Sequence, residues 1–371
     1  MKLKILIVIN SAWAAYNFRL NLANYLLDQG FEVSFLIPQD MKYSELIAKN
    51  FKCYFYNIQP NSSNPFSELN TFFSMFSNIV KSSADVCLIF SIKPNIYGSL
   101  ISVFLGKKYI NNISGLGTAF LVNSFRRIII INFYKLALKK SSCVFFQNMT
   151  DMKFFRSLNI SPDEKSKLIP GSGVDLKYFS PTNTPKNEKN YNFTFIGRLV
   201  IDKGIKEYLK AIDIVLQEYK KSDVNFSIVG DYDAKNPRSI DGKVFSKIRS
   251  SKRINFYSFS DDVRVYIERA DCIVLPSHRE GMPKVILEAF SMKKNVIVSD
   301  APGCKDLVED MVDGLICETY SAKSLAKTMI KMLTLDKDFK NQMRENARKK
   351  VEVFYDEKLI HLAYSEELKK M

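Results

Sequence analysis

Short apolar runs alternate with amphipathic stretches along the chain. Residues 3–10 and 31–38 are apolar enough to form buried strands, and residues 18–29 between them carry a helical stripe that ends at Gly30. The small and polar residues 11–17 predict a loop before that helix. This strand, helix, strand order is typical of a doubly wound α/β sheet, in which the loops that follow the strands bind ligands.

The same alternation continues to the end of the chain. Further strands are expected at residues 86–90, 109–113, 144–147, 191–196, 226–230 and 254–259. Further helices are expected at residues 123–140, 205–219, 325–333 and 355–371. Residues 181–190 are polar and contain two prolines, which predicts a boundary loop between two domains.

Charge is unevenly distributed. The chain holds 54 Lys and Arg against 39 Asp and Glu, and residues 1–180 alone hold 20 against 10. Between Val86 and Thr150 there is no acidic residue. The eight bases in that interval are Lys93, Lys107, Lys108, Arg126, Arg127, Lys135, Lys139 and Lys140. A basic half favours an anionic partner, either nucleic acid, acidic lipid or a diphosphate, and the alternative is a lysine-rich composition that serves solubility.

Composition narrows the class of protein. An apolar content of 46% is sufficient for real cores, and no apolar run approaches the roughly 18 residues of a membrane span. The first residues imitate a signal peptide, but an amphipathic helix follows at once, which favours a buried strand. Six cysteines without metal or redox spacing predict reduced thiols in a cytoplasmic protein. No helix-turn-helix, zinc or RNA-stacking motif supports a nucleic-acid partner.

The most informative stretch is residues 277–289. An apolar strand leads into a tight loop with Gly281 and Pro283, and a helical pattern follows. Glu280 lies in the loop, and Glu288 lies among apolar residues of the helix, where an unpaired carboxylate is costly. Either Glu280 is an ordinary residue of the helix N-terminus and Glu288 reaches solvent, or both accept hydrogen bonds from hydroxyl groups of a ligand whose phosphates lie near the helix terminus.

Two other loops carry candidate chemistry. Residues 197–204 place Arg198 and Lys203 between a strand and a helix, which suits a diphosphate, the alternative being a salt-bridged surface loop. The loop of Ser114, Gly115, Leu116 and Gly117 predicts a backbone cradle for a phosphate or a sugar, although two glycines also make an ordinary turn. Residues 231–233 spell Asp-Tyr-Asp, a metal-binding pattern elsewhere, but the strand and helix order around them favours a turn.

Glu280 and Glu288 with Gly281 and Pro283 between them, followed by residues 298–308 and by Asp313-Gly314, resemble the retaining glycosyltransferases of family 4. This resemblance implies that Glu280 contacts the donor sugar and is catalytic together with Arg198 and Lys203, which neutralise the diphosphate leaving group without a metal or cofactor. It implies that Glu288 binds the ribose. The other donor-binding residues it implies are Gly197, Gly281, Met282, Pro283, Lys284, Tyr257, Ser258 and Phe259.

The resemblance also implies the fold, two Rossmann-like doubly wound α/β domains facing across a cleft, the GT-B arrangement. The expected parts are an acceptor domain at residues 1–180, a donor domain at residues 181–354 and a helix at residues 355–371 that crosses back to the first domain. Many members have a histidine in the loop where this chain has Ser114, and the only histidines here are His278 and His361. A role for His278 near the donor stays open.

Residues 112–120 are similar to members that elongate polyprenyl-diphosphate-linked sugars. The implied reaction moves a hexose or an N-acetylhexosamine from a UDP-sugar to such a lipid-linked acceptor, at the inner face of the cytoplasmic membrane, which the basic first domain contacts peripherally. Two alternatives are a nucleotide-sugar epimerase of the same fold and a nucleotide-sugar-binding protein without catalysis. The sequence leaves the oligomeric state open.

Overall fold

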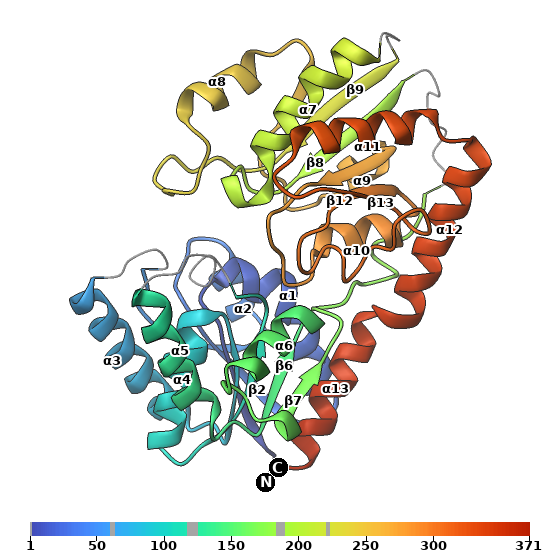
Figure 1. Ribbon diagram of the computed structural model, residues 1–371. Coiled ribbons are helices and arrows are strands. Elements are labelled where there is room, and N and C mark those ends of the chain that lie inside the picture. The colour runs from blue at the N-terminus through green and yellow to red at the C-terminus, as the bar shows by residue number, and fades with distance from the viewer. Residues whose placement is uncertain (1, 60–63, 117–124, 183–189, 220–222) are drawn as a thin grey trace. The chain divides into compact units, whose positions relative to one another are not determined.

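The computed structural model describes residues 2–59, 64–116, 125–182, 190–219 and 223–371, apart from the side chains of Phe125 and Arg126 (Figure 1). Contacts divide the chain into two compact units. Unit 1 comprises Met1–Ser172 and Lys358–Met371, and unit 2 comprises Gly173–Glu357. Each is an α/β unit built on one parallel sheet, which confirms the expected class.

Unit 1 contains a seven-stranded sheet in the order β3-β2-β1-β4-β5-β6-β7, with every pair of neighbours parallel. The strands are β1 (Lys4–Val8), β2 (Glu32–Ile37), β3 (Lys52–Phe55), β4 (Val86–Phe90), β5 (Lys108–Ile113), β6 (Cys143–Phe146) and β7 (Ser166–Leu168). The helices are α1 (Ala12–Asp28), α2 (Tyr43–Ala48), α3 (Pro65–Ser82), α4 (Ile92–Phe104), α5 (Phe125–Leu138), α6 (Met149–Ser157) and α13 (Glu357–Lys369), with the short 3-10 turn η2 (Asp163–Lys165).

Unit 2 contains a six-stranded parallel sheet in the order β10-β9-β8-β11-β12-β13. Its strands are β8 (Tyr191–Ile196), β9 (Val224–Val229), β10 (Ile254–Tyr257), β11 (Cys272–Leu275), β12 (Asn295–Ser299) and β13 (Leu315–Cys317). Its helices are α7 (Ile205–Glu218), α8 (Gly242–Ser250), α9 (Arg264–Arg269), α10 (Lys284–Ser291), α11 (Ala322–Thr334) and α12 (Lys337–Phe354), with η3 (Ile201–Lys203) before α7.

The predicted loop at residues 11–17 is wrong, because α1 already begins at Ala12. Ser11 is the N-cap of this helix, and its side chain accepts a hydrogen bond from the backbone N–H of Ala14 at 3.3 Å. The small residues after Ser11 are typical of a loop, but the capping serine starts the helix before the apolar stripe of residues 18–29 begins.

The units divide at residues 172/173 and 357/358, where the sequence placed the divisions after residues 180 and 354. The difference has a packing cause. Val174 forms an isolated parallel bridge with Asp356, and Val174 and Phe179 are buried in the core of unit 2. The segment after the first division therefore follows unit 2 rather than unit 1.

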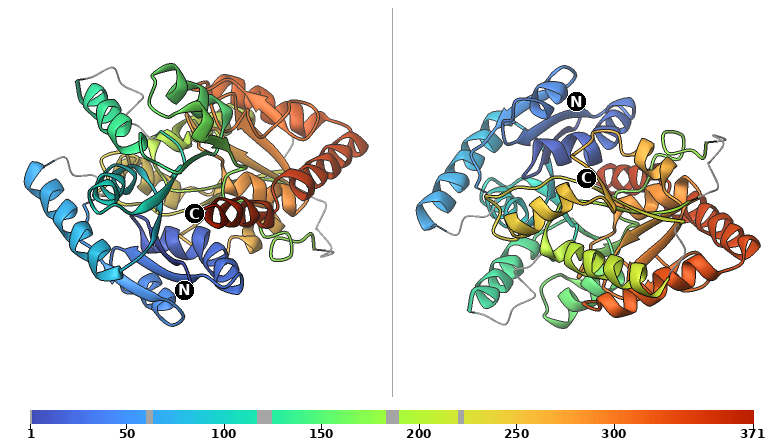
Figure 2. Two further views of the ribbon diagram at one scale, coloured as in Figure 1. Left: turned by 90° about the horizontal axis from the view of Figure 1, so that it is seen from below. Right: turned by 90° about the horizontal axis from the view of Figure 1, so that it is seen from above.

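Helix α13 returns to unit 1 and packs on its sheet beside α1 (Figure 2). Tyr364 and Ile360 are buried in the core there, and His361 stacks on Tyr25 of α1 with ring centroids 5.4 Å apart. Lys167 at β7 bonds Glu367 of this helix at 2.7 Å. The second histidine of the chain thus belongs to the packing of unit 1.

In each sheet the strand order reverses at one point, between β1 and β4 in unit 1 and between β8 and β11 in unit 2. Ligands of open parallel sheets bind beyond the carboxyl ends of the strands at such a switch point. The two switch points are therefore candidate positions for a binding site.

The described helices do not include one with the length and hydropathy needed to cross a membrane. All six cysteines are free thiols, five of them buried and Cys53 partly so. Burial raises the pKa of the Cys53 and Cys87 thiols to about 11 in each case, so both are poor nucleophiles at neutral pH.

Candidate active site

Two loops meet at the switch point of unit 2, one after β8 and one after β11. Gly204 has a φ of +73° at the N-cap of α7, and a Cβ at this position would overlap the carbonyl group of Pro276. Only glycine allows this close approach with that backbone conformation. Gly204 therefore fixes the distance between the loop that carries Arg198 and Lys203 and the loop that carries Glu280.

An ion pair joins the two loops. The Nζ of Lys203 lies 2.5 Å from Oε1 of Glu280, and both side chains are largely shielded, with 26% and 13% of their surface exposed. The hydroxyl of Ser277 donates to the same carboxylate oxygen at 2.6 Å. Two of the predicted catalytic residues, 77 positions apart in sequence, are thus brought together.

A third cation lies beside this pair. Arg198 is exposed, and its side chain forms no hydrogen bond or ion pair with any residue in the described ranges. Partial burial of its guanidinium, and then the nearby charge of Arg238, lower the pKa of Arg198. Like charges are held together in this way where an anion is expected to bind between them.

Arg238 was not predicted from the sequence. It lies in the loop after β9, and its Nη1 is 2.8 Å from Oδ2 of Asp202. The backbone N–H of Ile201 donates to the carbonyl of Arg238 at 2.8 Å, which ties the two loops together. Since no periodic pattern surrounds Arg238, only the spatial pairing of the loops identifies it as part of the site.

Glu288 lies in α10 with 8% of its surface exposed. Burial raises the pKa of its carboxyl group, and the charge of Lys284 opposes this shift only in part. No residue of the described chain donates a hydrogen bond to this carboxylate. A buried carboxyl group without a donor is costly, so Glu288 is available to accept hydrogen bonds from a ligand.

The loop between β11 and α10 is packed tightly. Gly281 and Pro283 are buried, and Met282 and Lys284 are half-buried. The backbone N–H of Glu280 donates to the carbonyl of Pro302 at 3.0 Å. This packing supports the predicted position of the loop backbone, while the role of these four residues in donor binding stays a prediction.

His278 contacts helix α7 and Tyr320. Its Nε2 is 3.3 Å from Oε1 of Glu207 in α7, and its ring centroid is 4.1 Å from that of Tyr320. Burial alone would raise the pKa of Glu207, but the imidazole and the backbone hold it below its ordinary value. We therefore interpret His278 as a group that fastens the loop to α7.

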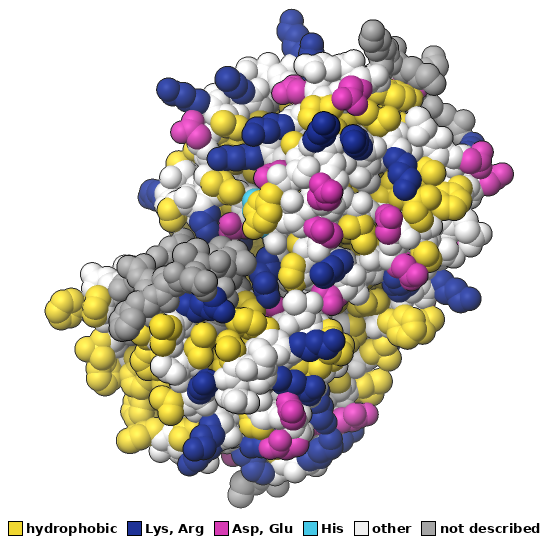
Figure 3. All heavy atoms as spheres, viewed as in Figure 1, with side chains coloured by type: hydrophobic (Ala, Val, Ile, Leu, Met, Phe, Trp, Pro, Cys, Tyr) yellow, Lys and Arg dark blue, Asp and Glu magenta, His cyan; other side chains and the backbone are white. Residues whose placement is uncertain are grey.

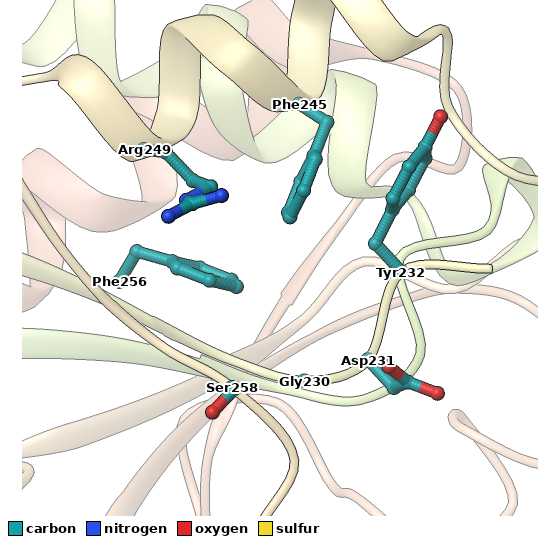
Figure 4. Close-up of a pocket in the computed structure, with 7 residues that line it drawn as sticks. All are labelled: Gly230, Asp231, Tyr232, Phe245, Arg249, Phe256 and Ser258. Carbon is teal, nitrogen blue, oxygen red and sulfur yellow. The ribbon is translucent and has the colours of Figure 1, made fainter. Parts of the chain in front are cut away.

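A pocket of about 460 Å³ opens at the carboxyl ends of β9 and β10 (Figure 4). The rings of Tyr232 and Phe245 are stacked with centroids 4.2 Å apart, and Phe256 meets Phe245 edge-on at 5.5 Å. The lining residues are Gly230, Asp231, Tyr232, Phe245, Arg249, Phe256 and Ser258. Flat aromatic walls with a few polar groups suit a heterocyclic ring.

Of the three residues predicted for base binding, Tyr257, Ser258 and Phe259, it is Ser258 that lines the pocket. Tyr257 packs its ring on Tyr266 with centroids 5.0 Å apart, and Phe259 is 44% exposed. Asp231 and Asp233 follow β9 in a turn, where the backbone N–H of Asn236 donates to the Asp233 carbonyl. Sequence reasoning missed Tyr232 and Phe245, because α8 showed no distinct pattern.

The predicted acceptor loop follows β5 in unit 1. Ser114 is exposed, and Gly115 has a φ of +130°, which only glycine adopts readily. Leu116 is 2% exposed and belongs to a hydrophobic core, so it contributes its backbone alone. Gly117 lies outside the described residues. The role of this loop stays a prediction.

Helices α3, α4 and α5 form one layer of unit 1, and their outer surface is unusually apolar (Figure 3). Phe66 is 83% exposed and Phe104 is 78% exposed. We define the apolar face as Phe66, Leu69, Phe73, Phe104, Ile128, Ile129, Phe133 and Leu136. Exposed lysines at positions 81, 135, 139 and 140 lie on the same helices or directly after them, and Glu68 is paired with Lys93 at 2.6 Å.

Comparison with known proteins agrees with this geometry. Residues 179–350 match the family model described as glycosyl transferases group 1, and residues 4–148 match the model described as glycosyl transferase 4-like. The chain is 28% identical over 365 residues to N,N'-diacetylbacillosaminyl-diphospho-undecaprenol alpha-1,3-N-acetylgalactosaminyltransferase of Campylobacter jejuni, with 94% of each chain covered.

A second relative is UDP-Gal:alpha-D-GlcNAc-diphosphoundecaprenol alpha-1,3-galactosyltransferase of Escherichia coli, which is 23% identical over 88% of this chain and 86% of its own length. Among solved structures, Anabaena HepE in complex with UDP-glucose superposes with a TM-score of 0.80 at 17% identity, covering 99% of this chain and 100% of HepE. At that identity the likeness shows the fold alone, and it confirms the expected GT-B class.

Proposed function

Because the chain belongs to the GT-B glycosyltransferases of the group 1 and 4-like families, we propose that it transfers a hexose or N-acetylhexosamine from a UDP-sugar to a polyprenyl-diphosphate-linked saccharide, with retention at the anomeric carbon. The observation that carries this proposal is the convergence of Arg198, Lys203 and Glu280 at the switch point of unit 2.

The cations stabilise the leaving group. As the glycosidic bond of the donor breaks, negative charge develops on the UDP diphosphate, and preorganised cations lower the energy of that state. Arg198 grips two phosphate oxygens, and Lys203 moves from Glu280 to the diphosphate. Arg238 adds positive charge from the loop after β9. With this charge in place, the reaction proceeds without a metal ion or cofactor.

The carboxylates position the donor. Glu280, freed from Lys203, accepts hydrogen bonds from the sugar hydroxyls, and Ser277 holds its orientation. Glu288 accepts hydrogen bonds from the ribose, which supplies the donors that this buried carboxylate otherwise lacks. The uracil enters the pocket of Tyr232 and Phe245, where its face stacks on an aromatic ring.

The acceptor is assigned from the relatives. The names of both relatives describe transfer to undecaprenol-linked diphosphate sugars, and HepE was crystallised with UDP-glucose. We extend both features to this chain. The protein then works at the cytoplasmic face of a membrane, to which unit 1 binds peripherally through its basic residues and the apolar face.

The direct test is a transfer assay. A panel of radiolabelled UDP-sugars is incubated with a lipid extract that contains diphosphate-linked saccharides, in the presence of EDTA. The proposal expects label in the lipid fraction for one donor. Label that is released only as free sugar, or no label at all although UDP binds, contradicts it.

A further inference from the structure

A buried arginine in unit 1 is not used by the proposed chemistry. Arg19 of α1 is 3% exposed, and its guanidinium carbon lies 4.1 Å from the ring centroid of Phe90. Its Nε is buried and has no hydrogen-bond partner. No ion pair or hydrogen bond connects the side chain to the described part of the protein.

Among the described residues, no carboxylate balances the charge of Arg19. Burial lowers the pKa of Arg19. A deprotonated Tyr364 phenol would oppose this shift, but burial raises the pKa of that phenol, so it is protonated and neutral at neutral pH. Phe90, Asn112 and Phe145 are neighbours across β4, β5 and β6. The Nδ2 of Asn112 donates to the Tyr364 hydroxyl at 2.8 Å. The Phe90 ring attracts the buried cation but does not supply the negative charge that a carboxylate would.

The backbone beside this arginine is strained. Ser91, directly after Phe90, has a φ of +73° and a ψ of 157°, a region that side-chain-bearing residues rarely adopt. Ser91 is the N-cap of α4, a helix of 13 residues, and provides no side-chain cap. The backbone N–H groups of a helix terminus attract anions, and Ile92 and Lys93 supply them here because Pro94 has none.

Arg19 and the N-terminus of α4 both belong to the switch point of the unit 1 sheet. Arg19 lies on the helix that follows β1, and Phe90 is the last residue of β4. β1 and β4 flank the switch point of unit 1. Arg19 packs on Phe90, the residue directly before the helix N-cap Ser91, so the buried charge and the strained helix terminus are neighbours at the edge of the sheet where ligands bind.

We propose that Arg19 and the N-terminus of α4 form an anion site at the switch point of unit 1, and that the site takes a phosphate or diphosphate group. The bound anion supplies the countercharge that Arg19 lacks, and the guanidinium offers several N–H donors to two oxygens at once. This site is distinct from the cations of unit 2, which the proposed function assigns to the UDP diphosphate.

The identity of the natural anion rests on the proposed function. Given that function, the anion is the diphosphate of the lipid-linked acceptor. In an acceptor with a single sugar, this diphosphate is bonded to the sugar that carries the attacking hydroxyl. Arg19 is then a positioning residue for the acceptor and takes no part in donor binding.

The first test uses inorganic pyrophosphate as the probe. In the Arg198→Ala/Lys203→Ala protein, which lacks two cations of unit 2, pyrophosphate should still raise the melting temperature. Adding Arg19→Met should abolish this rise, while adding Arg156→Met should leave it unchanged. Arg156 is the matched control because it lies in unit 1 and is paired with Asp163 at 2.9 Å. A rise that survives Arg19→Met overturns the proposal.

The variant also reports on the charge itself. Without ligand, Arg19→Met should be as stable as the parent protein or more stable, because replacing an unpaired buried charge by an apolar chain removes a desolvation penalty. Arg19→Lys retains the charge but not the forked geometry, so it should keep part of the pyrophosphate response. A marked loss of stability in ligand-free Arg19→Met, together with a pyrophosphate response that Arg19→Met retains, gives Arg19 a purely structural role and contradicts the proposal.

A kinetic test separates this inference from the proposed function. Arg19→Met should raise the KM for a diphosphate-linked acceptor roughly tenfold or more, as the loss of a charge-assisted contact predicts, and leave the KM for the UDP-sugar unchanged. An unchanged acceptor KM removes the acceptor assignment. If no sugar is transferred at all, the proposed function fails, yet the pyrophosphate response still decides the anion site.

Discussion

The ammonium group of Lys203 lies 2.5 Å from the Glu280 carboxylate and connects the loop after β8 with the loop after β11. Each group is the nearest counterion of the other before a donor binds. A diphosphate competes with Glu280 for Lys203, and the released carboxylate becomes available to the sugar hydroxyls. One ion pair thus links binding of the leaving group to positioning of the sugar.

This relationship predicts the effect of Lys203→Ala on nucleotide binding. Loss of one charge-assisted contact should weaken UDP binding by about 1.5–3 kcal/mol, or roughly tenfold to a hundredfold. Thermal shift and calorimetry with UDP in EDTA measure this. Lys206→Ala is the control and should bind UDP normally, because Lys206 is an exposed lysine in α7, the helix that follows the turn of Lys203. Equal UDP affinity in both variants would contradict the assignment.

The two glutamates should have separate effects. Glu288→Ala should weaken UDP binding itself, because the ribose loses hydrogen bonds to a carboxylate, each of which contributes about 1.5–3 kcal/mol. Glu280→Gln should lower kcat and leave UDP affinity near that of the parent, because its partner is the reacting sugar. Calorimetry with UDP and steady-state kinetics measure the two effects. The division of roles is wrong if both substitutions reduce UDP affinity to the same extent.

The sequence alone predicts most of the strands and helices around these residues, and the wrong or missing predictions have physical causes. β8 was predicted with its observed bounds, because its apolar run is flanked by clear loop signals. The pairing of Lys203 with Glu280 was not predictable, since it depends on how two distant loops meet. Arg238 and the stacked Tyr232 and Phe245 were missed for the same reason, because only the packing of α8 and the loop after β9 brings them to the site.

The burial of Glu288 has a consequence for stability against pH. Its pKa is raised in the folded state, so the protonated form is the one that folding favours. Its contribution to the free energy of unfolding is present below the unfolded pKa of about 4.3 and is lost as the pH rises through the folded pKa. Glu288→Gln should therefore stabilise the ligand-free protein at pH 7 and have little effect near pH 4. Chemical denaturation at both pH values tests this, and a gain that is equal at both would contradict it.

The aromatic pocket should select for the base. Phe245→Ala removes one wall of the Tyr232 stack and should weaken UDP binding by about 1–3 kcal/mol, in the range measured for stacking on bases. Phe354→Ala, which removes a 60% exposed aromatic ring elsewhere in unit 2, is the control. Calorimetry with UDP and with inorganic pyrophosphate separates base from phosphate binding. If Phe245→Ala reduces both affinities equally, the pocket does not hold the base.

The apolar face should bind anionic membranes. We expect the protein to sediment with liposomes that contain acidic lipid at low salt and to be released at high salt, since each base near such a surface contributes about 1 kcal/mol that salt screens. Reversing Arg126, Arg127, Lys139 and Lys140 to Glu should abolish sedimentation, and changing Phe66, Leu69 and Phe73 to Ser should weaken it at all salt concentrations. Val353→Ser and Phe354→Ser, on an exposed part of unit 2, should change nothing. If the protein binds neutral lipid equally strongly, the basic residues of unit 1 do not bind the membrane, and their role is in solubility.

Sugar transfer from a nucleotide donor at the switch point of unit 2 should retain the anomeric configuration of the donor, and this configuration can be measured in the product. A UDP-sugar is incubated with a short-chain polyprenyl-diphosphate saccharide in EDTA, and the new glycosidic bond is examined by NMR. We predict a disaccharide whose new linkage has the configuration of the donor, and its loss in Lys203→Ala. An inverted linkage, or an absolute requirement for added metal, would contradict the account.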